Sequence, residues 1–217
     1  MYNQKQEITL LDAVTPVAVT SSTDATPIVV TATSHGLATG DRVMIYGHTT
    51  NVAANGIYKV TKLTANTFSL QDEISGASVA GSGSGAGSSG VCLKAPAVPL
   101  VENFVNAILQ VGTTGTATTT VKVAGSLGKP ESQKSSPRYD YPNMGATVSP
   151  SNPYTFLQII NLDTAAAVNG ATGIVVAGAD INNTYEVNIN AIKYLTVIPV
   201  TWSAGAITIK LLLNSSI

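Results

Sequence analysis

Charged residues are scarce in this sequence. Asp, Glu, Lys and Arg make up 11% of its 217 residues, well below the quarter or so that is usual for a soluble globular protein. The 11 basic and 12 acidic residues give a net charge of −1, so the chain lacks the positive excess of proteins that bind nucleic acid. A surface with few charges also repels other protein molecules only weakly, so it favours association with them. This composition is typical of a protein that is packed against other subunits in an assembly. We expect no nucleic-acid partner.

Long apolar runs are also missing. Hydrophobic residues make up 44% of the chain, yet no stretch approaches the roughly 20 consecutive apolar residues that a membrane helix needs. The first 16 residues, MYNQKQEITLLDAVTP, show neither the basic start nor the apolar core of a signal peptide. We therefore expect no membrane partner and synthesis in a reducing cytoplasm.

Residues that carry chemistry are few and dispersed. A single cysteine, Cys92, excludes an internal disulfide, and its apolar surroundings, with Lys94 as the one basic neighbour, predict a buried, inert thiol. Neither His35 nor His48 stands at a metal-ligand spacing from Cys92 or from a carboxylate pair. Their positions indicate a turn histidine and a surface histidine.

Sequence motifs of enzymes are absent as well. The chain contains no GxSxG, and the glycines of residues 81–90 alternate with serine instead of following the GxxxxGK[ST] pattern of a phosphate-binding loop. We expect no catalytic activity, no cofactor and no bound metal ion.

The most informative stretch is SHGLATGDRVMIYGHTTNVAANGIYKVTKLTANTFSL, residues 34–70. Its His-Gly, Thr-Gly-Asp and Asn-Gly sequences are turn signals, because glycine accepts positive φ and Asp or Asn can bond to nearby backbone. Between the turns every second residue is apolar, which is the pattern of strands with one buried face. The alternating pairs are Val43 and Ile45, Tyr58 and Val60, and Phe68 and Leu70. The stretch therefore predicts a small antiparallel β module.

This stretch resembles a repeat module of tailed-bacteriophage structural proteins, named for its likeness to the first catalytic-cysteine half-domain of ubiquitin-activating enzyme. The resemblance covers about a sixth of the chain and implies a virion protein, without ubiquitin chemistry. The matching residues are His35, Gly36, Leu37, Thr39, Gly40, Asp41, Asn55, Gly56, Tyr58, Val60, Asn66, Thr67, Phe68 and Leu70. We call these the signature residues, and their expected roles are structural turns and core.

A proline-rich joint divides the chain. The Gly/Ser run of residues 81–90 has no side chains with which to build a core, so it is a loop. The resemblance implies one further strand after it, which Val91–Lys94 fits. The following Ala-Pro-Ala-Val-Pro forms a stiff extended segment. We predict a small β module over residues 1–95, including an N-terminal arm or edge strand, and a second domain over residues 96–217.

The second domain also has a β pattern. A Pro/Ser/Tyr-rich loop interrupts it over residues 126–153, and Val101–Ala107 allows one helical turn. Many short strands at this spacing predict a β-sandwich or jelly roll, which loosely resembles the terminal sandwich of phage decoration and fibre proteins. The expected strands are 108–111 and 117–123, joined by a turn at 112–115, then 154–162, 173–177, 184–189, 194–202 and 207–213, the last two joined by a hairpin loop at 203–206. The predicted fold class is all-β, with a barrel-like N-terminal module and a C-terminal sandwich.

One cluster in the long loop has the composition of an interface hot spot. Arg138, Tyr139, Asp140 and Tyr141 place a cation, a carboxylate and two aromatic rings within four residues. They form either a candidate protein-contact patch or a loop that packs on its own domain. Trp202 alternates in phase with strand residues, which favours packing within the sheet.

These observations favour a structural protein of a tailed-phage virion, assembled in the cytoplasm of the bacterial host. The first hypothesis is a capsid decoration or cement protein that docks on the major capsid protein or other virion subunits, as a homo-oligomer for which a trimer is one option. The alternative is a tail or tail-fibre component with a receptor- or carbohydrate-binding sandwich. Fibres usually carry long repeats or heptads, and the sequence has neither.

Overall fold

The computed structural model describes residues 5–73, 75–83, 90–127, 154–190 and 192–215. These residues form two compact units that meet in sequence at Thr15/Pro16 and at Ala95/Pro96. Residues 16–95 make the unit that we call the small module. Residues 5–15 join the described residues that follow Ala95 in the unit that we call the sandwich.

The small module is one antiparallel sheet of seven short strands, in the order β2-β8-β5-β6-β7-β4-β3. The strands are β2 (Val17–Ala18), β3 (Ser21–Ser22), β4 (Val29–Thr31), β5 (Arg42–Tyr46), β6 (Gly56–Lys62), β7 (Thr67–Gln71) and β8 (Val91–Lys94). A 3₁₀ turn, η1 (Val52–Ala54), lies between β5 and β6. The edge strands β2 and β3 are separated by only two residues. Val19 N donates to Gly90 O and Thr20 N to Thr31 O, so this crossing closes the sheet into a barrel-like curl.

The core of the small module follows the alternation read from the sequence. The paired residues of the three alternating runs, such as Val43 of β5 and Phe68 of β7, are all buried. Ile28 and Val30 add to the same core from the β4 region. The module therefore obtains its stability from a closed apolar interior and not from a disulfide, since Cys92 is free and buried there.

The sandwich is built on two strands of 21 residues each, β9 (Asn106–Ser126) and β15 (Tyr194–Asn214), which pair along their whole length. Its sheet has the order β1-β15-β9-β14-β11-β12, with β10 and β13 also paired to β9, and all pairs are antiparallel. The other strands are β1 (Lys5–Val14), β10 (Tyr154–Phe156), β11 (Ile159–Asn161), β12 (Ala167–Val168), β13 (Ile174–Ala179) and β14 (Asn182–Val187).

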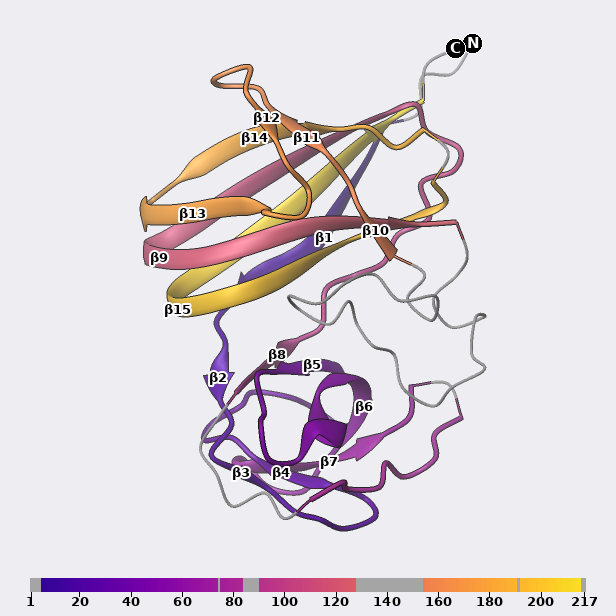
Figure 1. Cartoon of the computed structure of the whole chain (residues 1–217), viewed down its shortest axis with the longest axis vertical. Helices are drawn as coiled ribbons and strands as arrows, with labels where there is room; N and C mark the ends of the chain where they lie inside the picture. The colour runs from indigo at the N-terminus through magenta and orange to yellow at the C-terminus, as the bar shows by residue number, and fades with distance from the viewer. Residues whose placement is uncertain (1–4, 74, 84–89, 128–153, 191, 216–217) are drawn as a thin grey trace. The chain divides into compact units, whose positions relative to one another are not determined.

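Both long strands bend sharply near their middles, so the two halves of each strand lie in different layers (Figure 1). One layer combines β14 with the first half of β9, and the other combines β13 and β10 with the second half. Gly115, at φ +70°, lies at the bend of β9. Gly205 lies at the bend of β15, where a Cβ would approach Ala117 Cα to 2.7 Å. On either side of the bends, alternating residues of the two long strands bury their side chains: Ala107, Leu109, Val111, Ala117, Val121 and Val123 on β9, and Leu195, Val197, Ile207, Ile209, Leu211 and Leu213 on β15.

The predicted fold class, all-β with a barrel-like module and a sandwich, is confirmed. Several element boundaries were wrong. The residues 112–115 and 203–206, expected as loops, are bends inside continuous strands, because the neighbouring long strand keeps pairing across them with register shifts. Within Val101–Ala107 there is one hydrogen-bonded turn, in which Phe104 N donates to Val101 O at 3.1 Å, but no helix, and β9 already begins at Asn106. The expected strand 154–162 is divided into β10 and β11, which pair with different partners.

The N-terminal segment also lies elsewhere than expected. The sequence placed it with the small module as an arm or edge strand. In the structure β1 is an edge strand, but of the sandwich, where Lys5 pairs with Asn214 and Ile8 with Leu211. A register shift between Thr9 and Leu11 interrupts the alternation, and both Leu10 and Leu11 are buried; this apolar gain outweighs proximity in sequence.

Candidate functional site

The first signature residues form a hydrogen-bonded turn over the core of the small module. His35 Nδ1 accepts a hydrogen bond from Leu37 N at 3.0 Å, and the ring of His35 packs edge-on against Phe68. Gly36 takes the positive φ that the turn requires, +68°. His35 is 8% exposed, so its imidazole packs within the module.

The Gly40-Asp41 turn is held by the Asp41 carboxylate. Oδ2 accepts a hydrogen bond from Ala38 N at 2.9 Å, and Oδ1 lies 3.1 Å from Lys94 Nζ on β8. The hydrogen bond from the Ala38 backbone, together with Lys94, holds the Asp41 pKa below its ordinary value, against a smaller opposing effect of burial. This carboxylate therefore fixes a turn to the neighbouring strand.

Asn55 and Gly56 have a different role from the two-residue hairpin turn that their sequence suggested. The Asn55 side chain accepts from His48 N at 2.9 Å and donates to His48 O at 2.7 Å, which joins the two sides of the longer β5–β6 connection. Gly56 begins β6 at φ +143°, and a Cβ there would lie 3.0 Å from the hydroxyl of Tyr58. Tyr58 in turn donates to Ala53 O at 2.6 Å.

A buried polar cluster, which the sequence analysis missed, joins three distant segments of the module. Ser22 Oγ and His48 Nε2 are 2.8 Å apart, and Asn51 Nδ2 donates to Ser22 Oγ at 3.1 Å. Asn51 Oδ1 accepts from Ser82 N at 3.1 Å. His48 is therefore a buried residue, 2% exposed, and the expectation of a surface histidine was wrong. No spacing signal in the sequence links residues 22, 48, 51 and 82.

The Ser22–His48 pair has the distance of a nucleophile and its base, but its surroundings are those of a structural contact. Both side chains are buried. The second ring nitrogen faces the Thr50 hydroxyl at 3.4 Å, where a catalytic histidine would have a carboxylate to orient it. Burial lowers the pKa of His48 and raises that of Cys92 to about 12. We assign the cluster to the closure of the module.

The predicted contact patch, Arg138, Tyr139, Asp140 and Tyr141, lies outside the described residues. Trp202 is half-buried, and its indole N–H donates to Ala204 O at 3.1 Å and Gly205 O at 3.0 Å, so it caps the bend of β15. That the Trp202 ring packs against neighbouring strands of the sheet stays a prediction. The Thr-rich stretch of β9 presents Thr116 and Thr118 on the exposed face of its layer.

A row of three aliphatic and two acidic residues crosses the outer face of the layer that contains β14. Register pairs connect Ile160 with Glu186, Glu186 with Ile108, Ile108 with Leu212, and Leu212 with Glu7. Directly opposed residues of antiparallel strands share a face, at about 5 Å between Cα atoms. Ile160 is 42% exposed and Leu212 37% exposed. We call this set, from Ile160 to Glu7, the outer row.

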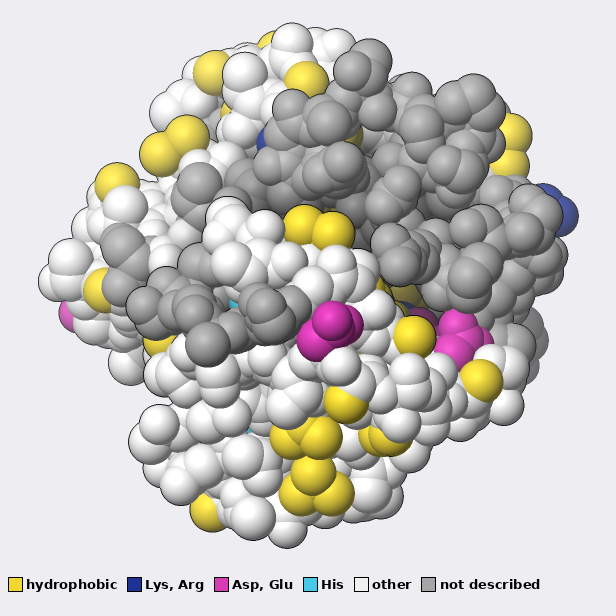
Figure 2. Space-filling view, turned by 60° about the horizontal axis from the view of Figure 1, so that its bottom comes forward, with side chains coloured by type: hydrophobic (Ala, Val, Ile, Leu, Met, Phe, Trp, Pro, Cys, Tyr) yellow, Lys and Arg dark blue, Asp and Glu magenta, His cyan; other side chains and the backbone are white. Residues whose placement is uncertain are grey.

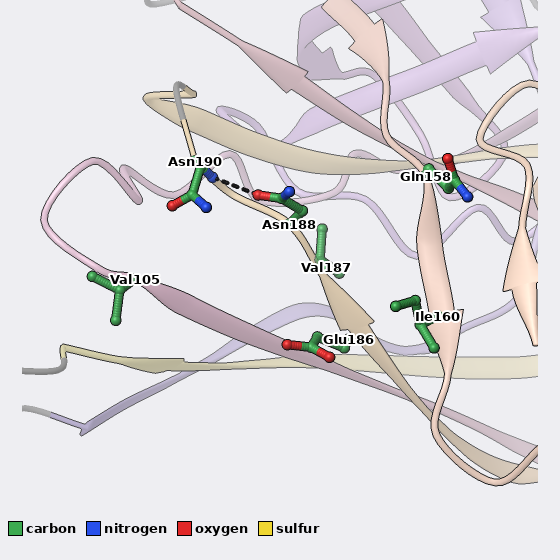
Figure 3. Close-up of a pocket in the computed structure, with 7 residues that line it drawn as sticks. All are labelled: Val105, Gln158, Ile160, Glu186, Val187, Asn188 and Asn190. Atoms are coloured by element: carbon green, nitrogen blue, oxygen red, sulfur yellow. Dashed lines mark hydrogen bonds between the residues drawn. The ribbon is translucent and has the colours of Figure 1, made fainter. Parts of the chain in front are cut away.

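A pocket opens at one end of the outer row (Figure 3). Its volume is about 350 Å³. Figure 3 shows Val105 and Ile160 on opposite sides of the pocket, with Glu186 and Val187 between them. The lining consists of three branched aliphatic residues, three amides and one carboxylate, namely Val105, Ile160, Val187, Gln158, Asn188, Asn190 and Glu186.

Charged side chains are sparse on the surface as well as in the sequence. Figure 2 shows a face on which uncharged polar side chains and backbone predominate, with a group of hydrophobic side chains and few charged ones among the described atoms. Within the described ranges, no group of three or more His, Cys, Asp or Glu side chains could hold a metal ion. The same residues contain no helix long and apolar enough to cross a membrane.

Comparison with known proteins finds little. No family model matches the chain, and no curated protein does. One solved structure, described as "Crystal structure of PBSX exported protein XepA", is similar at a TM-score of 0.35 with 12% sequence identity, over 99% of this chain and 82% of that one. We draw nothing about function from a similarity of that size.

The arrangement as a whole is suited to non-covalent contact. The candidate catalytic groups that the structure describes, Ser22, His48 and Cys92, are all buried. The accessible features are the outer row between polar neighbours and a pocket with one carboxylate. Such a face can bind another macromolecule by burying apolar surface and pairing one charge.

Proposed function

We propose that this chain is a structural protein of a tailed-bacteriophage virion, which docks on other virion subunits without covalent chemistry. The signature stretch of residues 34–70 carries the proposal, because its pattern resembles a module of phage structural proteins. Its residues also have architectural roles here: His35 and Phe68 pack together, Asp41 holds a turn, and Gly56 and Tyr58 shape the start of β6. A module whose characteristic residues build turns and core is a scaffold for presenting surfaces.

Within the virion, a capsid decoration or cement protein is the role that we favour. Such a protein gains affinity by spreading over neighbouring capsid subunits, so it needs adhesive surface. Interface centres are poor in charged residues, and the chain is poor in charge throughout, with only 11% charged residues. Several weak contacts made together would hold firmly. The proposed partner is the major capsid protein, and the proposed assembly is a homo-oligomer such as a trimer.

The experiment is a copy-number measurement on purified particles. Quantitative mass spectrometry should find the chain in amounts comparable with the major capsid subunit, and heads emptied of DNA should retain it. If the chain is present in a few copies and separates with detached tails, the decoration role is wrong and the tail alternative replaces it. If purified particles lack the chain, the virion role is wrong altogether.

A further inference from the structure

We propose that the outer row and its pocket bind a polypeptide segment of a partner subunit that carries aliphatic side chains and one arginine or lysine. The aliphatic side chains would cover Ile108 and Leu212, and the cation would enter the pocket to meet Glu186. This inference rests on the proposed function for the identity of the partner. It specifies that partner's chemistry from the geometry of the face.

The outer row has the layout of an interface, with an apolar centre and polar borders. Ile108 and Leu212 are direct neighbours across β9 and β15. One border is the next row, in which Thr184 pairs with Gln110 and Gln110 with Lys210. The other border includes Asn106, opposite Asn214. A partner that covers this face removes apolar surface from water at the centre while the borders stay solvated.

Charge determines what the pocket accepts. Glu186 is the one charged residue of its lining, and it forms no ion pair within the described part of the chain. The other carboxylate of the row, Glu7, is already paired with Lys210 Nζ at 2.9 Å. An anionic group would therefore be repelled from the pocket, and a cation would supply the partner that Glu186 lacks.

The remaining lining suits the rest of a basic side chain. Val105 and Ile160, both exposed, offer aliphatic contacts to its methylene groups, which lysine and arginine commonly bury along apolar surface. Gln158 and Asn190 add amide oxygens that can accept further N–H groups. Arginine, with five donors in a planar fork, fits this mixture of acceptors better than lysine.

The first test needs no phage particle. Backbone amide shifts of the isotope-labelled full chain are followed by NMR while the peptide acetyl-Val-Arg-Val-amide is added, and in parallel acetyl-Val-Glu-Val-amide and a neutral disaccharide, maltose. We expect shifts for Ile160, Glu186, Ile108 and Leu212 with the arginine peptide only. Equal responses to the two peptides, a response to maltose alone, or no response would overturn the proposal.

Charge reversal sharpens the same measurement. Glu186→Arg should weaken binding of the arginine peptide about tenfold or more, because the pair becomes repulsive, and should allow the glutamate peptide to bind. Val175→Arg is the matched control, because it adds the same cation on β13, at an exposed position outside the row, and Val175→Ser removes the aliphatic side chain from that position. Both controls should bind like the wild-type chain. If Val175→Arg weakens binding as much as Glu186→Arg, the pocket is not the site.

A particle assay then connects the pocket to the proposed function. Phage carrying Glu186→Arg should lose the chain from purified particles, while phage carrying Val175→Ser should retain it. Retention of Glu186→Arg at wild-type copy number would overturn the docking role of the pocket. Absence of the wild-type chain from particles would instead overturn the virion role, and the peptide result would stand independently.

Discussion

The ring of His35 meets the ring of Phe68 edge-on, with centroids 4.9 Å apart and planes inclined by 73°. This contact joins the beginning of the signature stretch to its end. Phe68 is fully buried, and His35 also anchors the turn through Leu37 N. Signature residues near the two ends of the stretch therefore meet within the small module.

Replacing Phe68 by alanine should lower the stability of the module more than replacing His35 by alanine. Phe68→Ala removes a fully buried ring and should reduce the free energy of unfolding by about 3–5 kcal/mol. His35→Ala loses one edge contact and one hydrogen-bond acceptor, so about 1–2 kcal/mol is expected. Urea unfolding followed by circular dichroism measures both, and Leu63→Ala, on a side chain 51% exposed, should change little. A larger loss for His35→Ala than for Phe68→Ala would contradict this packing.

Two glycines of the signature should differ in their tolerance of a methyl group. At Gly36, φ is +68° and no atom lies within 4 Å of an added Cβ, so Gly36→Ala should cost about 1 kcal/mol for backbone strain alone. At Gly56, φ is +143° and the Cβ would press on the Tyr58 ring. Gly56→Ala should cost about 2–3 kcal/mol. The same urea measurement ranks them, and equal losses would show that Tyr58 moves aside freely.

The buried His48 should make stability depend on pH. Burial places its folded-state pKa below the ordinary 6.5, so the unfolded chain binds the proton more readily. The contribution of neutral His48 to the free energy of unfolding is complete above pH 6.5. It is lost as the pH decreases from 6.5 toward the folded-state pKa. In the wild-type chain, the urea concentration at the midpoint of unfolding should decrease as the pH is lowered from 7.5 to 5.5. Glutamine does not titrate in this range, so in His48→Gln the urea midpoint should change less with pH. If the midpoint changes with pH as much as in the wild-type chain, other groups cause the dependence.

Cys92 should be chemically silent while the protein is folded. The thiol is 1% exposed and its pKa is raised to about 12 by burial, so almost no thiolate exists at pH 8. A thiol reagent such as 5,5′-dithiobis(2-nitrobenzoic acid) should label it only after urea unfolding. Rapid labelling in native buffer would contradict the buried position. Cys92→Ser should leave docking intact.

Strands β5, β6 and β7 of the small module were predictable because each one obeys a local rule, whereas β2 and β3 were not predicted. Val43, Tyr58 and Phe68 mark alternating runs between strong turn signals, and they are buried as that pattern predicts. The burial of these three runs is set by the residues within them, so local reasoning was sufficient there.

The sandwich was less predictable because its strand ends depend on distant partners. Gly115 and Gly205 signal bends, but β9 and β15 continue to pair through both bends, which no local pattern reveals. The position of β1 opposite β15 is likewise decided by the apolar surface that β15 offers. The outer row could not be found in advance, since it joins residues of five strands. The predicted contact patch at Arg138–Tyr141 stays a prediction.

The central claim is that this chain docks as a structural subunit on a tailed-phage particle through non-covalent contacts. A cryo-electron microscopy reconstruction of purified particles tests it most directly. We predict density for both β units on the outside of the head, with the outer row from Ile160 to Leu212 against a neighbouring subunit and a basic side chain at Glu186. Particles without this density, or density in which the outer row faces solvent, would contradict the account.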